Sequence, residues 1–222
     1  MTPVLVFDVN ETLLDLRALD PHFERIFGDG SIRRGWFGLV LRNALCVTIT
    51  GLVVDFLAVG AASLQMVADQ HGVALDDEDR GAVRQAMLTL PPHDDVVEGL
   101  DALRRAGYRL VALTNSPQAG AEAQLTNAGL ADRFERIFSV ETVGRFKPAA
   151  EVYRIPSDAL RVEMADMTMF AAHDWDVAGA MMAGMRGAYV TRPGMVRNPL
   201  YPPPDFEGPT LVEVAEKLIA AS

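Results

Sequence analysis

Short apolar runs alternate with stretches of helical spacing along most of the chain. The runs at residues 3–7 (PVLVF), 108–113 (YRLVAL) and 167–172 (MTMFAA) predict strands, and 137–140 and 188–191 predict shorter ones. Continuous apolar runs are typical of strands that are buried on both faces of a parallel sheet. Because helical patterns separate these strands, we expect an α/β fold: a three-layer, doubly wound parallel sheet with helices on both faces.

The spacing between these strands predicts helices and one long loop. We expect the helices at residues 96–106, 119–129, 148–160, 176–184 and 211–221. Pro156 interrupts the third of them, because proline opposes helix continuation. Residues 193–210 are rich in Pro, Gly and Asn and predict a surface loop.

The pattern changes between residues 14 and 91, where helical spacing dominates and no short apolar strand is evident. Pro91 and Pro92 end this region, since proline and the residue before it both disfavour a helix. We therefore expect a helical cap domain at residues 14–91, inserted into a core domain made of residues 1–13 and 92–222.

Composition and charge narrow the classes of function. The 222 residues are 50% hydrophobic and carry a formal net charge of −10, so neither nucleic acid nor an anionic membrane surface is an expected partner. The run at 45–64 has the length of a membrane span, but Asp55 within it would be costly in a bilayer, so we expect buried helices of a soluble domain. Cys46, the single cysteine, is expected to be buried, and the absence of a disulfide framework fits a cytoplasmic protein.

Polar residues follow four of the predicted strands. They are Asp8, Thr114 with Asn115, Lys147, and His173 with Asp176. Because the carboxyl ends of parallel strands share one edge of the sheet, we expect these side chains to converge on one pocket. The alternative is that each residue only forms a local hydrogen bond within its own loop.

Four segments resemble, in order, the motifs of the haloacid dehalogenase superfamily of hydrolases. They are FDVNETLLDL at 7–16, VALTNSPQ at 111–118, RFKP around Lys147 and MFAAHDWDVAGA at 169–180. The resemblance implies a Rossmann-like core with a small helical cap after the first strand. It also implies that Asp8 is a nucleophile.

Two positions distinguish this chain from the phosphatases of that superfamily. Those enzymes resemble one another in a second aspartate two residues after the nucleophile, and in an acidic Mg²⁺ ligand about four residues before the last aspartate. Here the two positions are Asn10 and Ala172, and Asp174 is two residues out of phase. An amide cannot transfer a proton as a carboxyl can, and Ala172 has no ligand atom, so we expect no metal site and no cofactor.

Further segments are similar to type II (S)-2-haloacid dehalogenases. They are residues 113–130, residues 139–153, the Trp175–Asp176 pair, and GSIRRGWF at 30–37, where those enzymes carry a cap arginine. The resemblance implies that Asp8 displaces halide from C2 of a small haloacid, and that water then hydrolyses the aspartyl ester to a 2-hydroxy acid. Lys147 would keep Asp8 ionised, and Asp176 would position Lys147 and help to activate the water.

The same resemblance assigns binding roles. Arg33, with Arg34 as the alternative, and Asn115 would bind the departing halide. The remaining residues expected at the substrate are Asn10, Thr12, Thr114, Tyr153, Trp36, Phe37, Phe56 and Trp175.

The chain departs from the best-known dehalogenase pattern, which has Tyr at Asn10 and Ser-Ser-Asn at positions 171–173. His173 would position water or act as a base, or else only bond to its loop, and the departures allow another substrate, including a fluorinated one. Two alternative functions stay open: a phosphatase or phosphonatase-like hydrolase of the same superfamily, and a binding protein without activity. Asp8, Lys147 and Asp176 argue against the second. The apolar surface expected on the cap predicts a homodimer.

Overall fold

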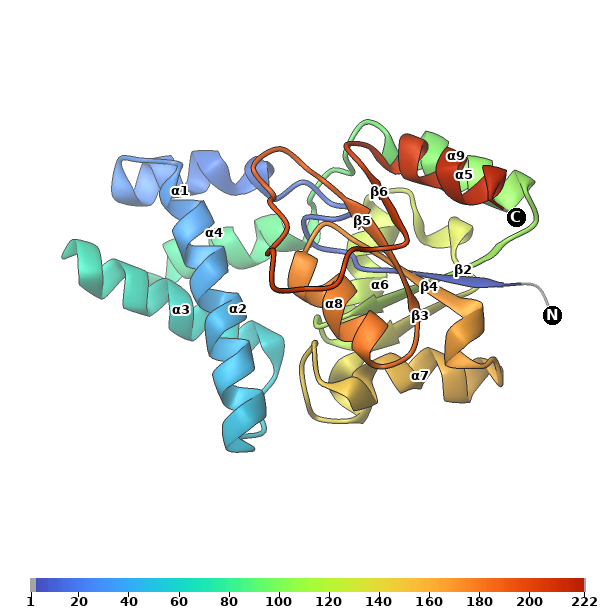
Figure 1. Ribbon diagram of the computed structural model, residues 1–222. Coiled ribbons are helices and arrows are strands. Elements are labelled where there is room, and N and C mark those ends of the chain that lie inside the picture. Colours follow the sequence, from blue (N-terminus) through green and yellow to red (C-terminus); the bar gives the residue numbers. More distant parts are fainter. Residues whose placement is uncertain (1–2, 222) are drawn as a thin grey trace.

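The computed structural model describes residues 3–221, and a six-stranded parallel sheet forms its centre (Figure 1). The strand order is β3-β2-β1-β4-β5-β6. The strands are β1 Val4–Phe7, β2 Arg109–Thr114, β3 Arg136–Ser139, β4 Met167–Ala171, β5 Arg186–Val190 and β6 Phe206–Gly208. The chain steps to one side of β1 for β2 and β3 and to the other side for β4 to β6, and ligands bind at such a reversal point in open α/β sheets.

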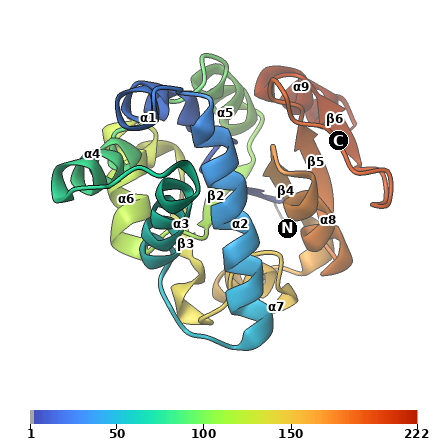
Figure 2. The same ribbon diagram turned by 90° about the vertical axis from the view of Figure 1, so that its left-hand side faces the viewer.

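Helices cover both faces of the sheet, as the alternating pattern predicts. They are α5 Val96–Arg105, α6 Gln118–Asn127, α7 Ala150–Leu160, α8 Asp174–Met182 and α9 Leu211–Ala220. Helices α5 and α9 lie side by side on one face, and α7 and α8 lie on the opposite face (Figures 1 and 2). The expected doubly wound α/β fold is therefore confirmed. Helix α7 continues through Pro156, which the sequence predicted to interrupt it.

A group of helices between β1 and α5 lies beyond the carboxyl ends of the strands (Figures 1 and 2). It contains a 3-10 turn at Leu16–Leu19 and the helices α1 Asp20–Phe27, α2 Ile32–Thr50, α3 Phe56–His71 and α4 Asp77–Leu88. These elements fall within residues 14–91. That this segment is a separate domain with those boundaries stays a prediction.

The apolar run at 45–64 is divided between two helices. Helix α2 ends at Gly51, whose φ of 73° is in the left-handed region that favours glycine, and Asp55 caps α3 by accepting from the N–H of Ala58 at 2.6 Å. Within residues 3–221 no helix is long and apolar enough to cross a membrane. The expectation that Cys46 is buried is wrong, because α2 buries the face that carries Trp36 and Val40 and leaves Cys46 exposed.

The prediction of a loop over 193–210 is wrong for its last part, where β6 pairs in parallel with β5 at the edge of the sheet. Strand β6 has only three residues, so it carries no apolar run that a pattern can reveal. Arg192, just before this segment, is buried and forms an ion pair with Asp95 at 2.7 Å, which ties the loop to the start of α5.

Candidate active site

Asp8 follows the central strand β1, and the turn after it holds its carboxylate. The N–H of Asp8 donates to the carbonyl oxygen of Phe170 in β4 at 3.0 Å. Thr12 donates through Oγ1 to Oδ2 of Asp8 at 2.6 Å and accepts from the N–H of Ala172 at 2.9 Å. Thr12 therefore fixes one oxygen of Asp8 from within the same turn.

Lys147 joins the two aspartates that the sequence placed at strand ends. Its Nζ lies 3.0 Å from Oδ1 of Asp8 and 2.9 Å from Oδ2 of Asp176, and its side chain is 1% exposed. Tyr153, on α7, donates its hydroxyl to Oδ1 of Asp176 at 2.7 Å. Asp176 stands in the first turn of α8. The segment that carries Lys147 and the helices α7 and α8 therefore meet at the end of β1.

His173 binds the other oxygen of Asp8 and a second carboxylate. Its Nδ1 lies 3.2 Å from Oδ2 of Asp8, and its Nε2 lies 2.8 Å from Oε2 of Glu11. The ring stacks on Trp175 with centroids 5.2 Å apart. Glu11 has a φ of 62°, which is uncommon for a residue with a side chain. Nothing in the sequence singles out Glu11, because its partner is 162 residues away.

The ionisation states follow from burial and pairing. Burial raises the pKa of Asp8, but Lys147 and His173 outweigh it and hold that pKa below its usual value. Burial lowers the pKa of His173, but its bonds to Asp8 and Glu11 dominate and raise it to about 10. At neutral pH a carboxylate at Asp8 thus faces an imidazolium at His173. A resting His173 is therefore a cation and not a free base.

The pKa values of Lys147, Asp176 and Tyr153 also depart from their usual values. Burial lowers the pKa of Lys147, but Asp176 and Asp8 overcome this and raise it. Burial raises the pKa of Asp176, with Lys147 opposing and the charge of Asp8 adding. Burial, followed by the charge of Asp176, raises the pKa of Tyr153. The tyrosine consequently stays protonated and donates a hydrogen bond to Asp176. Asp176 is a better proton acceptor than an ordinary carboxylate.

The two candidate arginines form their bonds with groups other than Asp8. Arg33 is buried, but its Nε lies 2.6 Å from Oδ1 of Asp20 and its Nη1 lies 3.7 Å from Oε1 of Glu11. Arg34 donates to the carbonyl oxygen of Gly194 at 2.7 Å. Asp8, Lys147, His173 and Asp176 form a group that we call the Asp8 cluster. Arg33 reaches this cluster only through Glu11, and its role at the halide stays a proposal.

The polar residues at the ends of β1 and β2 have different environments. Asn115 accepts through Oδ1 from the N–H of Lys147 at 3.0 Å, and among the described residues its Nδ2 donates to no partner. Asn10 donates to Oγ of Ser116 at 3.2 Å, and Thr114 accepts from the N–H of Ser116 at 3.1 Å. Asn115 thus presents a free donor, while Asn10 and Thr114 hold the loops together.

The predicted aromatic residues surround the cluster at different depths. The ring centroids of Phe37 and His173 are 6.2 Å apart, and the ring of Trp175 stacks on that of His173. Trp36 packs beside Phe37 at 6.0 Å and donates to the carbonyl oxygen of Gly60 at 3.2 Å. A cavity of about 340 Å³ lies beside Phe37, His173 and Trp175. Phe37 and Trp175 therefore border the site directly, and Trp36 supports them.

Comparison with known proteins identifies the family. The model of haloacid dehalogenase-like hydrolases matches residues 2–184. The chain belongs to this family.

Several relatives of this haloacid dehalogenase-like hydrolase have names that state an activity. An (S)-2-haloacid dehalogenase of Pseudomonas sp. (strain YL) is 28% identical over 214 residues, which cover 96% of this chain and 92% of that protein. Haloacetate dehalogenase H-2 of Moraxella sp. (strain B) is 26% identical and covers 93% of each chain. An L-2-haloacid dehalogenase from Xanthobacter autotrophicus, solved with chloropropionic acid covalently bound, superposes with a TM-score of 0.93 at 25% identity over all of both chains.

A family member that uses Mg²⁺ needs oxygen ligands beside its nucleophile. Here Oδ1 of Asn10 already accepts a hydrogen bond from Nε2 of Gln124, and Ala172 has no side-chain ligand atom. Lys147 and His173 place two positive charges on the carboxylate of Asp8. Within residues 3–221, no group of three or more His, Cys, Asp or Glu side chains is arranged to hold a metal ion. The donor set does not fit a Mg²⁺ ion.

Proposed function

We propose that this haloacid dehalogenase-like hydrolase converts 2-haloalkanoic acids into 2-hydroxy acids through an ester on Asp8. The observation that carries the proposal is the arrangement around Asp8: both of its oxygens are held by donors, its carboxyl is kept ionised, and Asn10 stands where an acid would be needed. A halide leaves without a proton, whereas an alcohol or an amine leaves with one. The names of the relatives point to the same reaction.

The first step uses the ionised carboxylate. An oxygen of Asp8 forms a bond to C2 of the acid while the carbon–halogen bond breaks, and the bonding pair leaves with the halide. Nδ2 of Asn115 is a free donor within the cluster and receives the halide. Lys147 and His173 offset the negative charge of the substrate carboxylate as it approaches Asp8.

The second step regenerates the carboxylate. Water adds to the ester carbonyl of Asp8, the bond between that carbonyl carbon and the ester oxygen breaks, the ester oxygen leaves with the 2-hydroxy acid, and the oxygen of the water stays on Asp8. One proton of the water passes to the product oxygen, and Asp176 takes the other. The raised pKa of Asp176 suits this role, and Tyr153 holds the accepting carboxylate in place.

Halide release from (S)- and (R)-2-chloropropionate and from fluoroacetate, with and without EDTA, tests the proposal. We expect release that EDTA does not reduce, and no release by Asp8→Asn. A single turnover in H₂¹⁸O should replace one oxygen of Asp8 by ¹⁸O and so raise the mass of the peptide that contains Asp8 by the difference between ¹⁸O and ¹⁶O. Failure to release halide from any of these acids, together with EDTA-sensitive release of phosphate from a generic ester, would instead identify a phosphatase.

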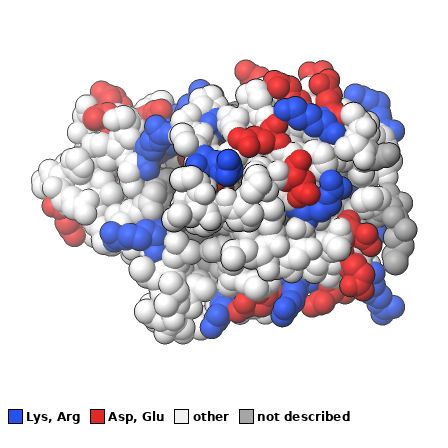
Figure 3. All heavy atoms as spheres, viewed as in Figure 1, with Lys and Arg blue, Asp and Glu red and all other residues white. Residues whose placement is uncertain are grey.

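We also propose that the protein is a cytoplasmic homodimer that binds no nucleic acid. Ile49, Leu52 and Val53 are exposed at the turn between α2 and α3, where Figure 3 shows a tip without charged side chains. Such an apolar surface is typical of an interface between subunits. Light scattering after gel filtration distinguishes a mass of twice 24.1 kDa from a monomer.

A further inference from the structure

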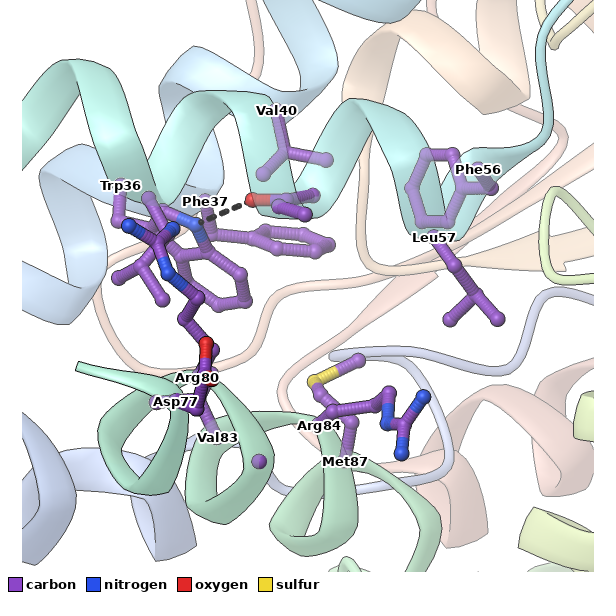
Figure 4. Close-up of a pocket in the computed structure, with 14 residues that line it drawn as sticks. Trp36, Phe37, Val40, Phe56, Leu57, Asp77, Arg80, Val83, Arg84 and Met87 are labelled. Atoms are coloured by element: carbon purple, nitrogen blue, oxygen red, sulfur yellow. Dashed lines mark hydrogen bonds between the residues drawn. The ribbon is translucent and has the colours of Figure 1, made fainter. Parts of the chain in front are cut away.

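A cavity of about 370 Å³ separates α4 from α2 and α3 (Figure 4). Apolar side chains form most of its wall, among them Trp36, Phe37, Val40, Phe56, Leu64 and Met87. Protein interiors are packed closely, with few voids larger than a water molecule. The volume lies at the lower end of the range of small-molecule sites, so it suits a chain or ring of a few carbons.

Glycines open the walls on both sides of the cavity. Phe56, Gly60 and Leu64 are four residues apart on α3 and therefore lie on one face, with Gly60 in the middle. A Cβ atom built on Gly60 meets no atom within 4 Å, and the same holds for Gly81 on α4. Both glycines stand inside helices, where glycine is unfavourable, so the space that they leave is obtained at a cost in stability.

The inner end of the cavity adjoins the Asp8 cluster at two side chains. Phe37 lies against His173, whose Nδ1 contacts the nucleophile, and Phe37 also lines the neighbouring cavity beside His173. Phe56 packs against Phe146, the residue before the catalytic lysine, with centroids 5.6 Å apart. The ring of Phe37 lines both cavities.

A third contact at the inner end reaches the nucleophile's own turn. The carbonyl oxygen of Met87 accepts from Nε2 of Gln124 at 2.8 Å. The same Nε2 donates to Oδ1 of Asn10 at 3.0 Å, two residues after Asp8. The residues that bound the cavity thus reach the cluster in three ways. Phe37 contacts His173, Phe56 contacts the neighbour of Lys147, and Met87 is linked through Gln124 to the turn after Asp8.

Charged groups are confined to the outer rim. Arg80 donates to Oε1 of Gln65 and so links α4 to α3 across one end. Asp77 and Arg84 line the cavity but are exposed to solvent. An occupant therefore meets an apolar interior that ends on one side at Phe37 and Phe56, which contact His173 and Phe146, and on the other side at solvent.

We infer that this cavity binds the apolar substituent on C2 of the substrate, so that the preferred acid carries a chain or ring of about four to six carbons beyond C2. The inference rests on the proposed function, because it assigns C2 to the end of the cavity at Phe37. The reaction then takes place at Asp8 while the substituent replaces solvent between α3 and α4.

Chain length and cavity filling test the inference together. We measure kcat/KM for halide release from 2-bromopropionate, 2-bromohexanoate and 2-bromooctanoate with the wild type and with Gly60→Leu. Each buried methylene is worth about fourfold in an equilibrium constant, so the wild type should favour the eight-carbon acid over the three-carbon acid by at least about tenfold. Gly60→Leu should reduce that ratio to near one. A ratio near one in the wild type overturns the inference.

Gly35→Leu is the matched control. Gly35 stands inside α2, a Cβ atom there also meets no atom within 4 Å, and it lies in a groove on another face of the same group of helices. Gly35→Leu makes the same change in helix propensity as Gly60→Leu, but its side chain does not enter the cavity between α4 and the helices α2 and α3. The control should keep the wild-type ratio, and an equal loss of selectivity in both variants overturns the inference.

A binding measurement separates this inference from the proposed function. Octanoate, which has no leaving group, should raise the melting temperature of the wild type and of Gly35→Leu more than butyrate does, and should not do so for Gly60→Leu. If this pattern appears while no bromoacid releases halide, the proposed function fails and the apolar acid site stands. If halide is released but octanoate and butyrate act alike in all three proteins, the inference fails and the function stands.

Discussion

The Asp8 cluster and the cavity between α4 and the helices α2 and α3 are neighbours that share the ring of Phe37, yet they are built in opposite ways. In the cluster Asp8, Lys147 and His173 are buried and each is held by at least two partners. The cavity is apolar, and glycines leave its walls open. From this difference we expect the groups around Asp8 to fix the reaction and the helices between β1 and α5 to select the substrate. Changes in the cluster should therefore affect all acids alike, and changes in the cavity should affect them selectively.

The largest effect is expected from Lys147→Met. Removing the ammonium leaves Asp8 and Asp176 as buried carboxylates without their shared cation, and such a loss costs about 3–5 kcal/mol. Asp176, whose pKa is already raised, then takes up a proton and can no longer accept one from the water, and Asp8 loses the donor that holds its Oδ1. We expect kcat/KM to fall by at least about a thousandfold for 2-bromopropionate and 2-bromooctanoate equally. Circular dichroism of the same sample must show a folded protein, and a loss confined to one of the two acids would contradict the comparison.

Glu11→Gln should lower the activity by an amount that depends on pH. In the folded protein the pKa of His173 is raised from 6.5 to about 10, partly by Glu11. A raised pKa stabilises the protonated fold, so this contribution is complete below pH 6.5 and is lost as the pH rises through about 10. Without the charge of Glu11 the loss should begin at a lower pH.

The measurement for Glu11→Gln is urea unfolding and kcat/KM at intervals of pH between 6 and 10. The variant should resemble the wild type most closely at pH 6 and fall to about a tenth of its activity near pH 9, since one pKa unit corresponds to tenfold in protonation. Asp20→Asn is a control that changes the charge beside Arg33 without touching His173. A pH-independent loss in Glu11→Gln would show that Glu11 only supports the fold.

The sequence predicted the sheet, its order of elements and most of the cluster because strand ends are visible as the points where apolar runs stop. Asp8, Lys147, His173 and Asp176 all follow such points, and a parallel sheet must bring them to one edge. That part of the site needed no knowledge of tertiary contacts.

The remaining parts depend on contacts that no local pattern carries. Arg33 does lie on the buried face of α2, but its partner is Asp20 at the start of α1, which only the packing of the helices decides. Glu11 meets His173 across the fold. The cavity is an absence of side chains between α3 and α4, and a glycine within a helical pattern does not by itself say which space it opens.

Tyr153→Phe should have a moderate effect that is the same for every acid. The change removes the hydroxyl that donates to Oδ1 of Asp176 at 2.7 Å and leaves the ring in its buried place. A hydrogen bond to a charged group contributes about 1.5–3 kcal/mol, so kcat should fall by about tenfold or more. Because we propose that Asp176 takes a proton from the water in the second step, we expect burst kinetics to show an ester on Asp8 that accumulates. A change in KM alone would argue against this role.

The smallest effect, and the most selective, is expected from Met87→Ala. Only the carbonyl oxygen of Met87 bonds to Gln124, so the link to Asn10 survives while the side chain leaves the inner end of the cavity. An acid with a branch or ring beside C2, such as 2-bromo-3-phenylpropionate, should gain room, and its kcat/KM should rise by about threefold relative to that of 2-bromopropionate. If both acids change by the same factor, Met87 acts on the nucleophile's turn, and the division between a fixed core and an adaptable cap does not hold at this residue.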